Sequence, residues 1–131
     1  MLDVVRARDA LLQLDGISKV ALVGRSFGGR MCARVAALEP PAALVLLGHP
    51  IAPPNRPRPE DEAALEAVTC PTLIVQGDRD ALGPLAVLER IARVNQSIEL
   101  SVLPGVGHQF GARQSQGLER AADWLQEVLG R

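Results

Sequence analysis

Aromatic residues are scarce in this sequence, which has two Phe, one Trp and no Tyr among 131 residues. Proteins that bind single-stranded nucleic acids stack the bases on aromatic side chains, so this scarcity argues against that class. The charge balance argues the same way, because 14 basic and 15 acidic side chains leave a net charge of −1. We therefore expect neither a nucleic acid nor an anionic membrane surface as a partner.

Long hydrophobic runs and cysteine frameworks are also missing. No apolar stretch approaches the roughly 18 residues of a membrane span, and the opening residues MLDVVR place charges where a secretory signal needs apolar side chains. Cys32 and Cys70 are too few for a disulfide framework and are not in Cys-x-x-Cys spacing. We expect a cytoplasmic protein in which both thiols are buried as small apolar side chains.

The chain has the length of one domain and is 47% apolar, so residues 1–131 are expected to form a single domain with a real core. Four short apolar runs predict strands over 19–24, 42–48, 72–77 and 98–103. Between and around them, helical spacing predicts helices over 4–14, 27–38, 60–67 and 84–94. A last helix is predicted from an N-cap at Ser115 to near Gly130, with one apolar face of Leu118, Ala121, Ala122, Leu125 and Val128. This alternation predicts an α/β fold, with a parallel sheet of about four strands flanked by helices on both faces.

The segment that follows the first predicted strand matches the pattern G-x-S-x-G, with Gly24, Ser26 and Gly28 at the fixed positions. Between a strand and a helix, this pattern is typical of a strained turn that holds a nucleophilic serine above the sheet. Gly24 and Gly28 would relieve crowding at the turn, and the Phe27 N–H would stabilise an oxyanion. A structural or phosphate-binding glycine loop is the alternative, although G-x-G-x-x-G and Gly-Lys-Ser/Thr endings are both missing.

Acidic and imidazole side chains follow the other strands. We interpret Asp80 as the acid that orients a catalytic histidine, and Asp78 as a residue that caps the turn or helix after it or pairs with Arg79. His108 lies in a glycine-rich loop after the fourth strand, where it could reach across the top of the sheet. His49 also follows a strand, but a proline-rich loop comes next, and we expect it to be a bystander.

Ser26, Asp80 and His108 follow successive parallel strands in the order serine, acid, histidine. This order is that of the α/β-hydrolase superfamily, which the chain resembles over its whole length. The proline-rich segment that leads into PTLIVQGDRD most resembles the KANL3/Tex30-type, dienelactone-hydrolase-like branch. The resemblance implies a serine hydrolase of small ester, thioester or related acyl compounds, with Ser26, His108 and Asp80 as catalytic triad and no metal or organic cofactor.

The resemblance covers only the second half of that fold, because family members ordinarily have about four more strands before the serine. The missing half normally supplies the second oxyanion donor, and losing one donor typically costs about 10²–10³ in rate. A non-catalytic interaction or scaffold module that keeps the triad is therefore the alternative function.

The first predicted strand, Lys19 to Gly24, is apolar on both faces after Lys19, and residues 20–24 have no charge or proline to protect a free edge. We expect its sheet to continue in a second copy, in another chain, or in residues encoded upstream. The sequence leaves these three open.

Overall fold

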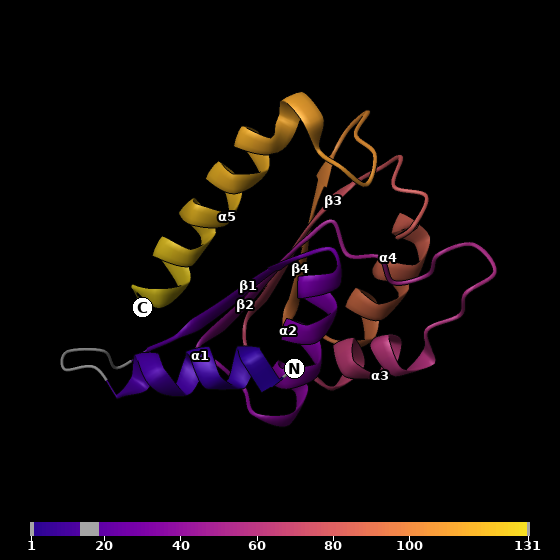
Figure 1. Cartoon of the computed structure of the whole chain (residues 1–131). Coiled ribbons are helices and arrows are strands. Elements are labelled where there is room, and N and C mark those ends of the chain that lie inside the picture. Colours follow the sequence, from indigo (N-terminus) through magenta and orange to yellow (C-terminus); the bar gives the residue numbers. More distant parts are fainter. Residues whose placement is uncertain (1, 14–18, 131) are drawn as a thin grey trace.

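A computed structural model describes residues 2–13 and 19–130 of the chain (Figure 1). Helices and strands alternate along most of it, as expected. In chain order the elements are α1 (Leu2–Leu12), β1 (Ala21–Arg25), α2 (Phe27–Leu38), β2 (Ala43–Leu47), α3 (Pro59–Ala67), β3 (Thr72–Gly77), α4 (Leu85–Val94), β4 (Ile98–Leu103), the 3₁₀ turn η1 (Gly111–Arg113) and α5 (Gln114–Leu129). The expected end of the first helix at Asp15-Gly16 lies outside the described residues.

The four strands form one parallel sheet in the order β1–β2–β3–β4. Every residue of β2 and β3 is buried, which explains why both segments are nearly continuous apolar runs. The outer strands β1 and β4 each combine buried residues with exposed ones, such as Val23 and Arg25 in β1 and Glu99 and Val102 in β4. The predicted α/β class with a four-stranded parallel sheet is therefore confirmed.

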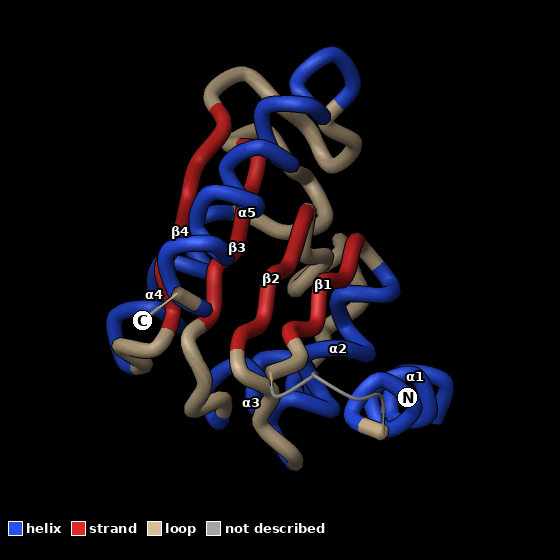
Figure 2. Tube along the Cα trace, turned by 90° about the vertical axis from the view of Figure 1, so that its left-hand side faces the viewer, coloured by secondary structure: helices blue, strands red, loops and turns tan. Residues whose placement is uncertain are grey.

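Helices cover both faces of the sheet, as Figures 1 and 2 show. One face packs against α2, α3 and α4 through a core that includes Leu44, Leu46, Ile74 and Ile91. The other face packs against α5, mainly through Trp124 and Ala121. No helix within the described ranges 2–13 and 19–130 is long and apolar enough to cross a bilayer.

The start and the buried face of the last helix differ from the prediction. Ser115 is not the N-cap, because the turn η1 leads directly into α5 and places Ser115 inside the helix. Leu118 and Ala122 face solvent rather than the sheet. The buried face instead follows Gly117, Ala121 and Trp124, since Gly117 lets the ring of Phe110 lie directly against the helix: a Cβ there would come within 2.8 Å of that ring.

Candidate functional site

Ser26 occupies the sharp turn between β1 and α2, at the carboxyl edge of the sheet. Its φ of 50° and ψ of −118° are strained for a residue with a side chain, at a cost of about 1–3 kcal/mol. Hydrogen bonds on both sides hold the turn: the Ser26 N–H donates to the Leu47 carbonyl at 3.2 Å, and the Ser26 carbonyl accepts from the Arg30 N–H at 3.2 Å. The neighbouring strand β2 and the first turn of α2 therefore hold Ser26 in this strained conformation.

Close backbone packing explains only one of the two glycines in the motif. A Cβ on Gly24 would lie 2.6 Å from the backbone of Gly29, so residue 24 has no room for a side chain. A Cβ on Gly28 would meet nothing within 4 Å. The expectation that Gly28 relieves crowding is thus wrong, because the next residue, Gly29, is the one that packs against Gly24.

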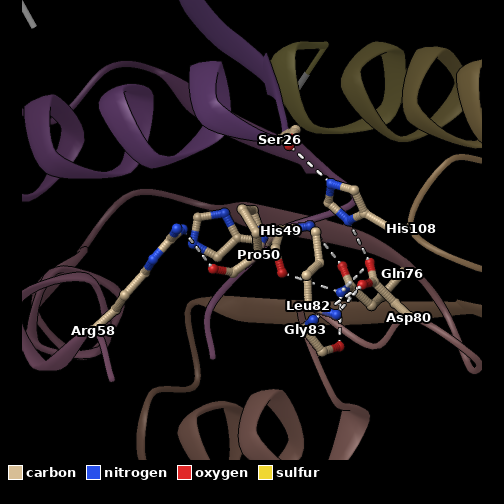
Figure 3. Close-up of polar contacts among 9 residues, drawn as sticks. All are labelled: Ser26, His49, Pro50, Arg58, Gln76, Asp80, Leu82, Gly83 and His108. Atoms are coloured by element: carbon tan, nitrogen blue, oxygen red, sulfur yellow. Dashed lines mark hydrogen bonds and ion pairs between the residues drawn. The ribbon is translucent and has the colours of Figure 1, made fainter. Parts of the chain in front are cut away.

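Three predicted side chains meet above the sheet (Figure 3). The Ser26 Oγ lies 2.8 Å from His108 Nε2, and His108 Nδ1 lies 2.9 Å from Asp80 Oδ2. With the Nδ1 proton donated to the carboxylate, Nε2 is free to accept the proton of the Ser26 hydroxyl. Such a chain of contacts is the arrangement that activates a serine hydroxyl as a nucleophile.

The carboxylate of Asp80 is fully buried, and its oxygens are well supplied with donors. Oδ1 accepts from the backbone N–H groups of Leu82 at 2.9 Å and Gly83 at 3.0 Å, while Oδ2 accepts from Gln76 Nε2 at 3.0 Å and faces His108. These contacts fix the orientation of the carboxylate. The imidazole of His108 is therefore held by a group that cannot easily rotate.

Gln76 is a residue that the sequence analysis overlooked. It is the only polar side chain after Thr72 in the buried strand β3, and it is fully buried. Its Nε2 lies within hydrogen-bonding distance of Asp80 Oδ2 and the carbonyls of His49 and Gly83, while its Oε1 accepts from the His49 N–H at 2.8 Å. A single amide in an otherwise apolar buried run was the signal that could have identified it, because such a group needs partners.

The loop over residues 104–110 carries His108 from β4 across the sheet. Asp78 fixes its start, since Asp78 Oδ1 accepts from the Gly105 N–H at 2.8 Å. Asp78 therefore caps a loop distant in sequence and not, as was expected, the turn directly after it. Gly77 allows the loop to descend onto β3, because a Cβ there would lie 2.1 Å from the Val106 carbonyl oxygen. Gly48, with φ of +63°, similarly leaves space for the His108 carbonyl.

Ser26 and His108 open onto a shallow depression of about 420 Å³, lined also by Arg25 and Gln109. Arg25 lies over the ring of Phe110, with 5.3 Å from its guanidinium carbon to the ring centroid. Phe27 is the first residue of α2, where a backbone N–H has no partner within the helix. An acyl group could therefore approach Ser26 from solvent, with this N–H close to the nucleophile.

His49 lies beneath the site and does not line the depression. It is 1% exposed, and neither ring nitrogen has a hydrogen-bond partner in the described structure. Burial lowers the pKa of His49 to about 4; Asp61 opposes this shift, and the charges of Arg30 and Arg58 add to it. The ring is therefore neutral at pH 7. Its Nδ1 would lie 3.4 Å from a Cβ on Gly29, so it packs under the Ser26 turn.

Both cysteines are buried, as expected, and burial raises the pKa of each thiol. They are accordingly poor nucleophiles at neutral pH. Within residues 2–13 and 19–130, no group of three or more His, Cys, Asp or Glu side chains could hold a metal ion.

Comparison with known proteins gives a match to one family model. A family model described as an alpha/beta hydrolase domain matches residues 3–130. A search of curated proteins gives no match.

Several solved structures have a similar fold. Est1E from Butyrivibrio proteoclasticus is 19% identical with a TM-score of 0.81, covering 98% of this chain and 69% of its own. An alpha-beta serine hydrolase homologue from Coxiella burnetii is 28% identical with a TM-score of 0.72, covering 90% of this chain and 53% of its own. A bacterial membrane phospholipase A is 17% identical with a TM-score of 0.70, and the match covers 97% of this chain and 62% of that protein. The chain thus spans between about half and two thirds of these proteins.

Proposed function

The chain belongs to the α/β-hydrolase family, and on this premise we propose that it is a serine hydrolase of small esters, thioesters or related acyl compounds. The observation that supports the proposal most is the hydrogen-bonded series from Ser26 through His108 to Asp80, with distances of 2.8 and 2.9 Å. The strained turn at Ser26 and the open depression beside it fit the same role.

In the proposed mechanism, Ser26 Oγ attacks the acyl carbon while His108 Nε2 takes the hydroxyl proton. Asp80 stabilises the imidazolium that forms, and the Phe27 N–H stabilises the negative oxygen of the tetrahedral intermediate. The intermediate expels the alcohol or thiol leaving group, which receives the proton from His108, and an acyl-enzyme remains. Water then attacks the acyl carbon with His108 again as base, which releases the acid and restores Ser26.

We also propose that the chain belongs to the KANL3/Tex30-type, dienelactone-hydrolase-like branch of the family, on the strength of the segment from His49 to Asp80. A cytoplasmic location is proposed with it, because the free thiols Cys32 and Cys70 suit a reducing compartment.

A panel of p-nitrophenyl esters and acyl thioesters tests the proposed activity. We expect a burst of about one equivalent of leaving group followed by a slower steady rate, since an acyl-enzyme accumulates when its hydrolysis is slow. The Ser26→Ala variant should show neither phase. Equal rates in the wild type and Ser26→Ala would contradict the proposal.

One observation favours a second candidate, an interaction module that works without catalysis. β1 is an edge strand, and its residue Val23 is 50% exposed. Residues 20–24 of this edge carry no charge, with Lys19 and Arg25 on either side, and an apolar edge is a template for pairing with another strand. For this candidate we propose a homodimer paired along 19–24. Sedimentation should then show a dimer that Val23→Lys converts to a monomer and Ser26→Ala leaves intact; a monomeric wild type would contradict it.

A further inference from the structure

Three arginine side chains surround a second depression, of about 260 Å³, between α2 and the start of α3. Arg30 and Arg34 come from α2, and Arg58 comes from the loop before α3. We call this site the arginine pocket; it is lined by Arg30, Arg34, Pro57, Arg58, Pro59 and Glu60. Figure 3 shows the side chain of Arg58 reaching toward His49 and Pro50, where its Nη1 donates to the Pro50 carbonyl at 2.9 Å.

The carboxylates around the pocket do not balance its guanidinium groups. Buried Asp61 accepts from Arg30 Nε at 2.7 Å and from Arg34 Nε at 2.9 Å. Glu60, whose side chain is mostly exposed, lies 3.6 Å from Arg34. Three guanidinium groups against two carboxylates leave one unit of positive charge.

Arg58 carries the unbalanced charge. It has no carboxylate within ion-pair distance in the described part of the chain, and only one of its nitrogens has a hydrogen-bond partner there. Burial lowers the pKa of Arg58, repulsion from Arg30 lowers it further, and attraction to Asp61 opposes this shift. His49 next to it is neutral, so it adds no charge of either sign. The remaining N–H donors of Arg58 are thus available to an anion.

The pocket adjoins the catalytic serine through the first turn of α2. The Arg30 N–H donates to the Ser26 carbonyl at 3.2 Å, so Arg30 lies one helical turn from the serine. The guanidinium of Arg30 lies over the ring of Phe27, 5.7 Å from its centroid. A substrate whose carbonyl lies at Ser26 could therefore reach the pocket with a short carbon chain.

We propose that the arginine pocket binds a carboxylate at the far end of the acyl substrate, so that the preferred substrates are monoesters or monothioesters of short dicarboxylic acids. This inference rests on the proposed role of Ser26. A carboxylate fits better than a phosphate monoester, because one negative charge matches the single unbalanced positive charge. Guanidinium groups also match the geometry of a carboxylate in bidentate pairing.

The ion pairs of Asp61 have a simpler role as well, since they attach α3 to α2. That role does not involve Arg58. Substitution of Arg58 therefore separates recognition of an anion from packing of the two helices, and Arg58 is the residue to test.

The test compares p-nitrophenyl monoesters of succinate, glutarate and adipate with the neutral p-nitrophenyl butyrate. In the wild type, we expect kcat/KM to be highest for one of the three anionic esters. Arg58→Gln should lower the ratio of anionic to neutral kcat/KM by about 10- to 100-fold, as for loss of a charge-assisted hydrogen bond. Most of the change should lie in KM, and Arg58→Lys should restore part of it.

Arg56→Gln is the matched control, because Arg56 lies on the same loop, is exposed and does not line the pocket. It should change the ratio by less than about twofold, since Arg56 is exposed to solvent and offers no donor to a carboxylate in the pocket. An equal loss of ratio in Arg56→Gln and Arg58→Gln would overturn the proposal, as would an unchanged ratio in Arg58→Gln.

A binding measurement separates this inference from the proposed function. Calorimetry on Ser26→Ala should detect monomethyl glutarate but not dimethyl glutarate, and Ser26→Ala/Arg58→Gln should bind neither. If no ester is hydrolysed but this pattern holds, the pocket stands and the hydrolase function fails. Binding of inorganic phosphate without binding of monomethyl glutarate would overturn the carboxylate assignment.

Discussion

His108 Nε2 lies 2.8 Å from Ser26 Oγ although the two residues follow strands at opposite edges of the sheet. Four strands separated by about 4.8 Å each place β1 and β4 roughly 14 Å apart. The 104–110 loop crosses this distance, supported by Gly77 and by the Asp78–Gly105 hydrogen bond. The proposed site therefore depends on how this loop lies across β2 and β3 as much as on the turn at Ser26.

Asp80→Asn should reduce activity more than stability. The Asn oxygen can still accept from the N–H groups of Leu82 and Gly83, but its NH₂ group would face the donors of His108 and Gln76. In serine proteases the corresponding change lowers kcat by about 10⁴ because the histidine takes the wrong tautomer. We expect a loss of similar order in steady-state ester hydrolysis. A loss below tenfold in a variant with wild-type stability would show that Asp80 does not orient His108.

Gln76→Leu should destabilise the protein and reduce kcat together. The substitution removes partners from the His49 N–H, the Gly83 carbonyl and Asp80, and each unsatisfied buried group costs about 1–3 kcal/mol. Urea unfolding measures the loss. Thr72→Val is the matched control in the same strand, because the contacts of the Thr72 hydroxyl are the Cys70 carbonyl and the Cys70 thiol, and neither belongs to the site. It should cost about 1 kcal/mol and leave kcat unchanged.

Gly24→Ala and Gly28→Ala should differ sharply. A Cβ at residue 24 overlaps the backbone of Gly29 at 2.6 Å, so Gly24→Ala must displace the turn that holds Ser26. Gly28→Ala enters open space in a helix, where alanine is favoured by about 0.5–1 kcal/mol. Thermal unfolding and labelling of Ser26 by an active-site probe should therefore be impaired in the first variant only. Equal tolerance of both substitutions would contradict the described packing.

His49 should make stability depend on pH in mildly acidic solution. Its pKa is about 4 when folded and near 6.5 when unfolded, so between these values the unfolded chain binds a proton that the folded chain does not. Lowering the pH through this window should reduce the free energy of unfolding by roughly 3 kcal/mol. His49→Leu should remove most of this slope in urea unfolding between pH 4 and 7. At pH 8 it should not destabilise, because it also removes two unpaired nitrogens.

Local patterns in the sequence predicted the bounds of helices and strands well where one or both faces of the element are buried. The bounds of α2, β3 and β4 agree with prediction, and β1 and β2 differ by one or two residues. The start of α5 could not be predicted, because Gly111–Arg113 forms a turn that depends on how Phe110 packs against Gly117.

The residues of the candidate site likewise include some that the sequence predicted and some that it could not. Ser26, Asp80 and His108 were identifiable because each follows a strand at the edge where parallel strands end. Gln76 and the pairing of Gly24 with Gly29 were not, since both depend on which backbones approach each other in space. The arginine pocket is a third case: Arg58 is distant in sequence from Arg30 and meets it only because α3 packs on α2.

Covalent labelling with a fluorophosphonate probe, read by intact mass, tests the central claim most directly. The wild type should gain the mass of one adduct, because the probe reacts with a serine whose hydroxyl is activated by a neighbouring base. Ser26→Ala and His108→Ala should each remain unlabelled under the same conditions, while Ser101→Ala, a serine in β4 outside the site, should label like the wild type. A folded wild type without an adduct, or an adduct that persists in Ser26→Ala, would contradict the assignment of Ser26 as an activated nucleophile.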